Sequence, residues 1–208
     1  MTETLVLATR NEGKIRELAA ILADAKVTLA GLGEFPDAPD VPETGATFEE
    51  NALIKARAIA AYTGLPAVAD DSGLCVDALN GMPGVLSARW SGRHGDDKAN
   101  LDLVLAQISD VPDSRRGAHF ACAAALAVPV LPATPDRPVE TFTEHVVTGK
   151  VNGRLIREPR GSGGFGYDPI FVPDGYDITT AEMPAAEKNA ISHRGKAFRA
   201  LAPLIRRI

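Results

Sequence analysis

The chain begins with two apolar runs separated by a helical repeat, and this order limits the folds open to it. Residues 4–8 are almost wholly apolar without alternation, which predicts a strand buried on both faces of a sheet. Apolar residues then recur at helical spacing over residues 15–25, and residues 27–32 predict a second strand. Strand, helix and strand in this order are typical of the βαβ unit. The sequence therefore predicts an α/β fold.

The rest of the chain adds further helices and strands. Thr47 and Glu50 fit a capping box, which predicts a helix that runs through about Tyr62. Residues 119–130 and 140–151 predict two long strands that pair as an antiparallel ribbon. The other expected elements are a strand over residues 65–69 that resumes over 74–76, a helix over 96–109, a short strand over 170–172, and a terminal helix with Phe198, Leu201, Leu204 and Ile205 on its core face.

The composition excludes several classes of protein. The 208 residues are enough for one sizeable core or for two small lobes sharing a cleft. A formal net charge of -5 argues against nucleic-acid binding through a broad basic face. Cys75 and Cys122 lack the spacing of a disulfide framework or a zinc site, so we expect buried thiols in a reducing compartment. With no leader-like segment and no apolar run near the ~18 residues of a membrane helix, we expect a soluble, cytoplasmic protein.

Two adjacent carboxylates follow the apolar run of residues 65–69. Asp70 and Asp71 precede Ser72 and Gly73, and open α/β folds bind ligands where buried strands end. Adjacent side chains of an extended segment point to opposite faces, so the two carboxylates are expected to have different roles. We expect the pair at a bulge or corner between two strand pieces. The alternative is that Asp-Asp-Ser-Gly is simply a turn.

The turn between the first strand and the first helix is a candidate phosphate site. Residues 9–14 are polar, and the backbone N–H groups at a helix start suit an anion. Lys14 adds a cation on the first helical turn. The spacing of a Walker A loop is absent, and a solvated helix start is the alternative.

Three further polar groups accompany other elements. Glu43 lies in an acidic, proline-rich loop over residues 33–46, just before the helix that carries Lys55; a solvent-exposed side chain without a function is the alternative there. Residues 161–168 combine four glycines with Phe165 and Tyr167, which allows close backbone approach and offers rings on which a nucleobase can stack. A flexible linker is the alternative there. The last group of donors, Lys188, His193 and Arg194, precedes the terminal helix and suits an anionic or carbonyl-rich partner, although a solvated cluster is the alternative.

Together these groups describe a site for a nucleoside triphosphate. Carboxylates suit a divalent metal, lysines suit phosphates, aromatic rings suit a base, and the remaining donors suit its edge. Hard oxygen ligands beside phosphates favour Mg²⁺, which usually keeps several waters and one or two protein carboxylates.

Five motifs of this sequence, in order, resemble those of the inosine/xanthosine triphosphate pyrophosphatases. The resemblance extends from residue 4 to the final helix. The motifs are Thr9-x-Asn11-x-x-Lys14, Glu43-Thr44-Gly45-x-Thr47-Phe48-x-Glu50-Asn51-Ala52, Ala69-Asp70-Asp71-Ser72-Gly73-Leu74, Gly163-Gly164-Phe165-Gly166-Tyr167-Asp168-Pro169 and Ser192-His193-Arg194-Gly195.

The resemblance implies a fold, a reaction and an assembly. The fold is a single domain over residues 1–208, with an elongated mixed central sheet flanked by helices and two lobes with a nucleotide-binding cleft between them. The reaction is Mg²⁺-dependent hydrolysis of ITP, dITP and XTP to the nucleoside monophosphate and pyrophosphate, which keeps aberrant purines out of DNA and RNA. No nucleic-acid or membrane partner is expected. The assembly is a homodimer, with residues 84–90, which fit no expected element, as a candidate part of its interface.

The resemblance also implies roles for individual residues. Asp71 is the catalytic carboxylate and, with Glu43, a metal ligand, although Asp70 is an alternative base. The residues expected to bind substrate are Thr9, Arg10, Asn11, Glu12, Gly13, Lys14, Lys55 and Ser72 on the phosphate side, and Phe165, Gly166, Tyr167, Asp168, Lys188, His193 and Arg194 on the nucleoside side.

The base-side donors account for part of the expected selectivity. Hypoxanthine and xanthine present an acceptor at O6, whereas adenine presents an amino donor there. A buried donor left facing another donor costs about 1–3 kcal/mol. Two alternatives remain: a pyrophosphatase for other nucleotides, and a nucleotide sensor or single-stranded RNA module that would not need Glu43 and Asp71.

Overall fold

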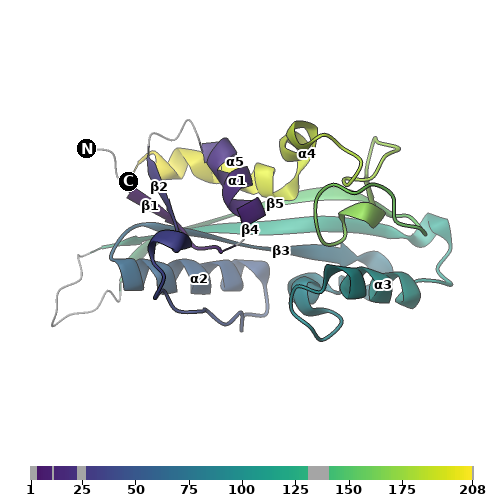
Figure 1. Cartoon of the computed structure of the whole chain (residues 1–208), viewed down its shortest axis with the longest axis horizontal. Coiled ribbons are helices and arrows are strands. Elements are labelled where there is room, and N and C mark those ends of the chain that lie inside the picture. Colours follow the sequence, from purple (N-terminus) through teal and green to yellow (C-terminus); the bar gives the residue numbers. More distant parts are fainter. Residues whose placement is uncertain (1–3, 11, 23–26, 131–140, 208) are drawn as a thin grey trace. The chain divides into compact units, whose positions relative to one another are not determined.

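The computed structural model of the chain describes residues 4–10, 12–22, 27–130 and 141–207. Its six-stranded sheet has the order β2-β1-β3-β4-β5-β6 (Figure 1). Among the described residues, no helix is long and apolar enough to cross a membrane. The strands are β1 (Thr4–Leu7), β2 (Thr28–Gly31), β3 (Ala67–Val76), β4 (Gly117–Pro129), β5 (Phe142–Leu155) and β6 (Phe171–Pro173). The helices are α1 (Glu12–Leu22), α2 (Phe48–Thr63), α3 (Asp97–Gln107), α4 (Ala185–Ile191) and α5 (His193–Ile205), with short 3-10 turns η2 (Leu32–Glu34), η3 (Asp77–Leu79), η4 (Gly84–Arg89), η5 (Asp113–Arg115) and η6 (Asp168–Ile170).

The sheet is mixed, as expected. β1 pairs in parallel with β2 and with β3, which confirms the βαβ unit predicted from the first thirty residues. β4 and β5 are neighbours, and backbone hydrogen bonds link Val130 N to Thr141 O (3.0 Å) and Leu155 N to Arg116 O (2.9 Å). The partners run in opposite directions along the sequence, so the predicted antiparallel ribbon is confirmed. β6 pairs antiparallel with β5.

By its internal contacts the chain groups into two compact units. Unit 1 comprises residues 1–71, 122–148 and 194–208, and unit 2 comprises residues 72–121 and 149–193. Each unit has its own apolar core, described below.

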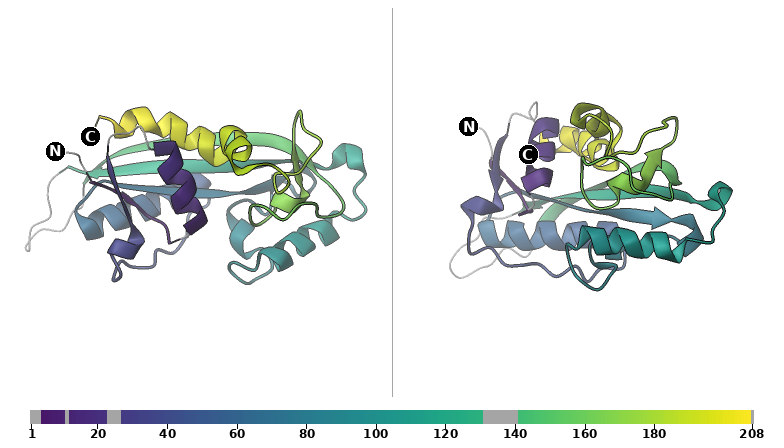
Figure 2. Two further views of the ribbon diagram at one scale, coloured as in Figure 1. Left: turned by 45° about the horizontal axis from the view of Figure 1, so that its top comes forward. Right: turned by 45° about the vertical axis from the view of Figure 1, so that its right-hand side comes forward.

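In unit 1, helices cover both faces of the sheet. α1 and α5 lie on one face and α2 lies on the other (Figures 1 and 2). Side chains alternate along β3 accordingly: Val68 packs with α1 and α5, whereas Ala67 and Ala69 pack with α2. The expected core face of α5 is confirmed by Phe198, Leu201 and Ile205, which are buried, while Leu204 packs at the edge of the same cluster.

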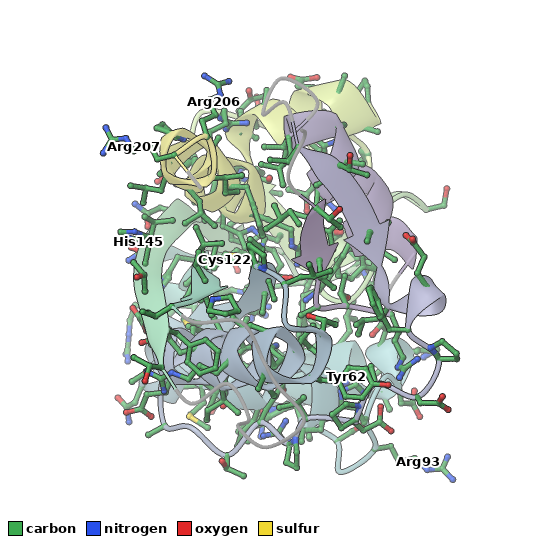
Figure 3. The ribbon with its side chains drawn as sticks, turned by 90° about the vertical axis from the view of Figure 1, so that its left-hand side faces the viewer. Tyr62, Arg93, Cys122, His145, Arg206 and Arg207 are labelled. Atoms are coloured by element: carbon green, nitrogen blue, oxygen red, sulfur yellow. The ribbon has the colours of Figure 1, made fainter. Side chains whose placement is uncertain are left out.

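The two cysteines are buried free thiols, as predicted from their spacing. Cys122 lies in the core of unit 1, whereas Tyr62, Arg206 and Arg207 lie at the surface (Figure 3). Burial raises the pKa of the Cys122 thiol far above its usual range, which keeps it protonated and unreactive.

The core of unit 2 forms around β6, α3 and η6. Phe171 is fully buried, and its ring meets that of Phe120 edge-on, with centroids 4.7 Å apart. Residues 84–89, for which no element was expected, form η4. Trp90, which follows it, packs at the edge of this core and donates a hydrogen bond from Nε1 to Gln107 Oε1 (2.8 Å).

One local prediction was wrong. Asp70 and Asp71 do not lie at a corner, because β3 continues without interruption from Ala67 to Val76. The alternative interpretation, that Asp-Asp-Ser-Gly is simply a turn, is wrong for the same reason. Gly73 is needed instead for close packing, since a Cβ there would lie 2.4 Å from both Gly84 O and Ser87 Oγ. Ser87 Oγ in turn accepts a hydrogen bond from Leu74 N (2.9 Å).

Candidate active site

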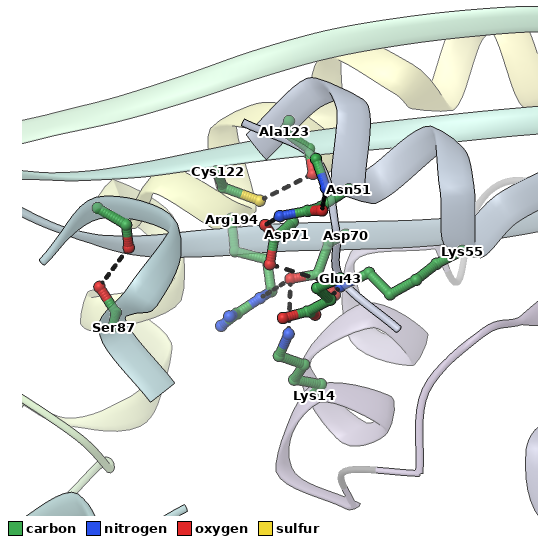
Figure 4. A network of polar contacts seen from close by, with 12 residues as sticks. Lys14, Glu43, Asn51, Lys55, Asp70, Asp71, Ser87, Cys122, Ala123 and Arg194 are labelled. Atoms are coloured by element: carbon green, nitrogen blue, oxygen red, sulfur yellow. Dashed lines mark hydrogen bonds and ion pairs between the residues drawn. The ribbon is translucent and has the colours of Figure 1, made fainter. Parts of the chain in front are cut away.

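The two neighbouring carboxylates of β3 lie on opposite faces of the sheet in unit 1. Asp70 follows Val68 in the alternation and faces α1 and α5, and Asp71 follows Ala69 and faces α2. Their partners differ accordingly (Figure 4). The prediction that they have different roles is consistent with this arrangement.

Asp70 is paired with two cations. Its Oδ2 accepts from Lys14 Nζ on α1 at 3.0 Å and from Arg194 Nε on α5 at 3.1 Å. The Asp70 side chain is 2% exposed and that of Arg194 is 4% exposed, so water screens this pair little. Burial alone would raise the pKa of Asp70, but the charges of Lys14, Arg194 and Lys55 outweigh it and hold that pKa far below its usual range.

Asp71 has a different environment, shared with a second carboxylate. Lys55 Nζ lies 2.7 Å from Glu43 Oε1 and 3.5 Å from Asp71 Oδ1, while Asn51 Nδ2 donates to Asp71 Oδ2 at 3.0 Å. Burial raises the pKa of Asp71 and the nearby Glu43 adds to the effect, which the Lys55 charge and the Asn51 hydrogen bond only partly offset. The same carboxylates raise the pKa of Lys55 against the effect of its burial, so this lysine is charged.

The beginning of α2 positions these groups. Thr47 caps the helix as predicted, because its side chain accepts from Glu50 N at 3.1 Å. Glu50 reaches back to Ala46 N (2.6 Å) rather than to the backbone of the cap residue. Lys55 then lies two turns into a well-formed helix, which fixes its backbone relative to β3.

The donor set suits a magnesium ion. Glu43 and Asp71 both approach the Lys55 ammonium, so their carboxylates converge on a place where a cation is already stabilised. Among the described residues, no group of three or more acidic, histidine or cysteine side chains lies close enough together to hold a metal ion. Mg²⁺ needs none, because it retains waters and takes one or two carboxylates together with substrate phosphates.

In unit 2, Asp168 organises the glycine-rich loop. Its Oδ2 accepts from Lys188 Nζ at 2.5 Å and from Phe165 N at 2.8 Å, and its Oδ1 accepts from Thr180 Oγ1 at 2.7 Å. The Lys188 ammonium also lies 5.2 Å from the centre of the Phe165 ring. Phe165 is 43% exposed, so a large part of an aromatic side chain lies at the surface beside a partly buried ion pair.

The neighbouring loop residues have structural contacts. Tyr167 is buried and its hydroxyl donates to Ser87 O at 2.8 Å, while Gly166 N donates to Asp97 Oδ2 at 2.8 Å. A cavity of about 370 Å³ opens between α3 and the loop, lined by residues that include Asp97, Leu101 and Phe165. His193 stacks on Phe120 with ring centroids 4.9 Å apart. The structure therefore gathers Phe165, Asp168 and Lys188 at one place, and Tyr167 belongs to the core.

The remaining predicted site residues lie near β1, within β3 or outside the residues that the structure describes. Thr9 and Arg10 follow β1, and Arg10 Nη2 donates to Ala38 O at 2.8 Å. Asn11 and the side chain of Glu12 lie outside the described residues, and Gly13 lies in the first turn of α1. Ser72 follows Asp71 within β3 and is half-buried.

Two polar residues of these clusters received no role from the sequence. Asn51 and Thr180 are both buried and both contact a carboxylate named above. A signal existed for Asn51, because asparagine is unfavourable inside a helix and here follows the capping box directly. Thr180 lies outside regular structure and carries no such signal.

Comparison with known proteins gives one consistent result. The model of the Ham1 family matches residues 5–204. A Streptomyces coelicolor protein named dITP/XTP pyrophosphatase is 63% identical over 206 residues, covering 98% of each chain, and a Nocardia farcinica protein of the same name is 58% identical, covering 97% of this chain and 94% of its own.

Solved structures agree with the sequence matches. The crystal structure of a nucleoside-triphosphatase, or dITP/XTP pyrophosphatase, from Mycobacterium abscessus has a TM-score of 0.74 at 55% identity, covering 96% of this chain and 99% of its own. A HAM1 protein from Coxiella burnetii has a TM-score of 0.84 at 41% identity, covering 100% of both chains. The mixed α/β fold expected from the sequence is thereby confirmed.

Proposed function

The chain belongs to the Ham1 family, and we propose that it hydrolyses the deaminated purine nucleoside triphosphates ITP, dITP and XTP to the monophosphate and pyrophosphate. Relatives up to 63% identical carry the name dITP/XTP pyrophosphatase. The observation that carries the proposal is a buried carboxylate of raised pKa, Asp71, facing a charged lysine and a second carboxylate. A binding module has no need of such a group.

Asp71 is the residue assigned to proton transfer. Water attacks the α-phosphorus in line with the bond to the oxygen that bridges to the β-phosphate; that bond breaks and the electron pair leaves with pyrophosphate. The proton of the attacking water passes to the Asp71 carboxylate. Asp70 suits this role poorly, because Lys14 and Arg194 hold its pKa far below the usual range and a weak base accepts a proton reluctantly.

The triphosphate is assigned to the cations of unit 1. Lys14 carries its positive charge on the first turns of α1, beside Asp70, and its ammonium is assigned to phosphate oxygens. Lys55 stabilises negative charge that develops in the transition state. The backbone N–H groups at the start of α1 suit an anion. The other residues assigned to this part of the substrate are Thr9, Arg10, Asn11, Glu12, Gly13 and Ser72.

Glu43 and Asp71 are the residues proposed to hold Mg²⁺. When bound, the ion neutralises phosphate charge and makes pyrophosphate a better leaving group. The two carboxylates fit this use because both already approach one cation, the Lys55 ammonium.

The nucleoside is assigned to residues of the glycine-rich loop, of α4 and of the first turn of α5. The exposed Phe165 ring offers a stacking surface, and the Lys188 ammonium beside it offers a donor for O6 of hypoxanthine or xanthine. An adenine amino group at the same place would face that donor. The remaining residues assigned to the nucleoside are Gly166, Tyr167, Asp168, His193 and Arg194.

A panel of triphosphates tests the proposal. Purified protein with Mg²⁺ is given ITP, dITP, XTP, GTP, ATP and CTP, and pyrophosphate and orthophosphate are measured separately. We expect pyrophosphate from the first three at rates at least about a hundredfold above the rate with ATP, which corresponds to one or two mismatched buried donors at the 6-position. Preferred release from CTP would indicate a different pyrophosphatase, and tight binding of ITP without turnover would indicate a nucleotide sensor.

We also propose a homodimer that acts in the cytoplasm. The relevant measurement is the sedimentation coefficient of the wild-type protein and of Trp90→Ala. An unchanged dimer in the variant would remove residues 84–90 from the proposed interface, and a wild-type monomer would contradict the dimer itself.

A further inference from the structure

Asn51 is a fully buried polar side chain with partners at both ends. It lies on α2, one residue after the capping box, and is 0% exposed. Its Nδ2 donates to Asp71 Oδ2 at 3.0 Å, and its Oδ1 accepts from Gly45 N at 2.7 Å. One amide therefore joins the strand that carries Asp71 to the segment that leads from Glu43.

The two contacts fix which way the amide points. A backbone N–H can only donate and an ionised carboxylate can only accept. Rotating the Asn51 amide by half a turn would place its NH₂ group against the Gly45 N–H and its oxygen against Asp71, so both hydrogen bonds would be lost. The buried site consequently always presents a donor to Asp71 Oδ2.

The Gly45 end of this bridge is closely packed. A Cβ at Gly45 would lie 2.6 Å from Glu50 Cβ and 2.8 Å from Asn51 Oδ1, so the segment can lie against the helix only because residue 45 has no side chain. Glu50 adds a hydrogen bond to Ala46 N at 2.6 Å. Glu43 stands two residues before Gly45, and its carboxylate reaches Lys55 from there.

We propose that Asn51 is a positioning residue for the reaction assigned above: its amide sets the orientation of the Asp71 carboxylate and, through Gly45, the place of the Glu43 segment. Asp71 Oδ2 is held by the amide, which leaves Oδ1 directed toward Lys55, the lysine that also binds Glu43. The role rests on the proposed function, but the bridge itself is a property of the free protein and is tested separately.

Two variants separate positioning from simple packing. Asn51→Asp preserves the shape and the acceptor for Gly45 N but removes the donor to Asp71, whereas Asn51→Ala removes both contacts. The matched control is Asn100→Asp, because Asn100 is 1% exposed on α3, its Oδ1 accepts from Ser91 N at 2.7 Å, and its Nδ2 has no hydrogen-bond partner in the described part of the chain.

Steady-state kinetics with ITP give the first readout. We expect Asn51→Asp to lower kcat by about 10- to 100-fold, the usual effect of losing a group that orients a ligand or catalytic side chain, with KM changed by less than about threefold. Asn100→Asp should retain wild-type kcat. Wild-type kcat in Asn51→Asp, with loss only in Asn51→Ala, would overturn the proposal and leave Asn51 a packing residue.

Hydrogen exchange in the nucleotide-free protein gives a readout that needs no activity. The side-chain amide protons of Asn51 should be protected in the wild type and exchange at least about tenfold faster in Asp71→Ala, while Gly45 N–H stays protected. Unprotected Asn51 amide protons in the wild type would overturn the bridge even if the variants fail to fold. If the wild type hydrolyses none of the triphosphates but these protons are protected, the proposed function fails while the bridge stands.

Discussion

The two faces of β3 place the same side chain in opposite electrostatic conditions. On one face Asp70 is enclosed with Lys14 and Arg194, and the pKa of its carboxyl is far below the usual range. On the other face Asp71 shares a single lysine with Glu43, and the pKa of its carboxyl is raised. Burial alone raises the pKa of both, so the number of cations per carboxylate decides the difference.

This difference indicates a division of labour along two adjacent residues. A carboxylate paired with two cations is held in place and accepts a proton poorly, which suits it to fixing Lys14 and Arg194. Asp71 shares the Lys55 ammonium with a second carboxylate and therefore keeps a higher pKa. This higher basicity suits it to accepting a proton in the reaction. Variants on each face can test this comparison.

The largest loss of stability is expected on the Asp70 face. Asp70→Asn removes the charge that pairs with Lys14 and with the buried Arg194, and breaking such a buried pair costs about 3–5 kcal/mol in the free energy of unfolding. Urea denaturation measures it. A cost below about 1 kcal/mol would mean that the Asp70 face is no more than an ordinary surface pair.

The pH dependence of that loss has a definite sign. Because the folded pKa of Asp70 is below the unfolded value of about 3.9, the charged group stabilises the fold above that pH, and this contribution is lost as the pH falls toward the folded pKa. The stability gap between wild type and Asp70→Asn should therefore be constant between about pH 6 and 8 and narrow below about pH 4. A gap that widens on acidification would contradict the assignment.

On the Asp71 face the corresponding variant is Lys55→Met. It removes the cation that both carboxylates share, and we expect kcat/KM to fall about 10²- to 10³-fold, as for the loss of one group that stabilises transition-state charge. Lys150→Met is the control, because Lys150 is exposed on β5 and is not among the residues assigned to the substrate or the metal. An equal fall in kcat/KM in both variants would mean that the effect is not specific to Lys55.

A variant that touches neither face sharpens the comparison. Phe165→Ala removes the exposed ring, and losing a stacked base contact costs about 1–3 kcal/mol, so KM for ITP should rise about 5- to 150-fold. Neither kcat nor the free energy of unfolding should change greatly. A fall in kcat with constant KM would remove Phe165 from base binding.

The smallest effect is expected for an ion pair that joins α2 to β5 near the surface. Arg57 Nε and Nη2 donate to Glu144 at 2.5 and 2.7 Å, but the arginine side chain is 46% exposed. Arg57→Ala should cost only about 0.2–1 kcal/mol in thermal or urea unfolding. A cost comparable to that of Asp70→Asn would show that burial does not separate these pairs.

The features that were predicted best from the sequence are those set by residues close together in the chain. The β1-α1-β2 unit and the Thr47 cap follow from periodicity and local hydrogen bonding. The corner expected at Asp70 failed because turn-forming residues stand there for other reasons: two carboxylates bind side chains from both faces, and Gly73 packs against Ser87.

The partners of the site residues could not be predicted in the same way. Asp70 and Arg194 are 124 positions apart, and no local pattern encodes such a contact. The family resemblance named Lys14, Asp70 and Arg194 without pairing them. It also named Asn51 only as part of a motif, and its role follows from a buried amide with one possible orientation.

The most direct test measures Asp71→Asn and Asp70→Asn side by side, as pyrophosphate release from ITP with Mg²⁺ after folding has been checked by circular dichroism. We expect Asp71→Asn to lower kcat about 10²- to 10⁴-fold with little change in stability, the range expected for loss of a catalytic proton acceptor. Asp70→Asn should mainly lower stability and raise KM. The reverse, a folded Asp70→Asn protein without turnover beside an active Asp71→Asn protein, would contradict the assignment of chemistry to the α2 face of β3.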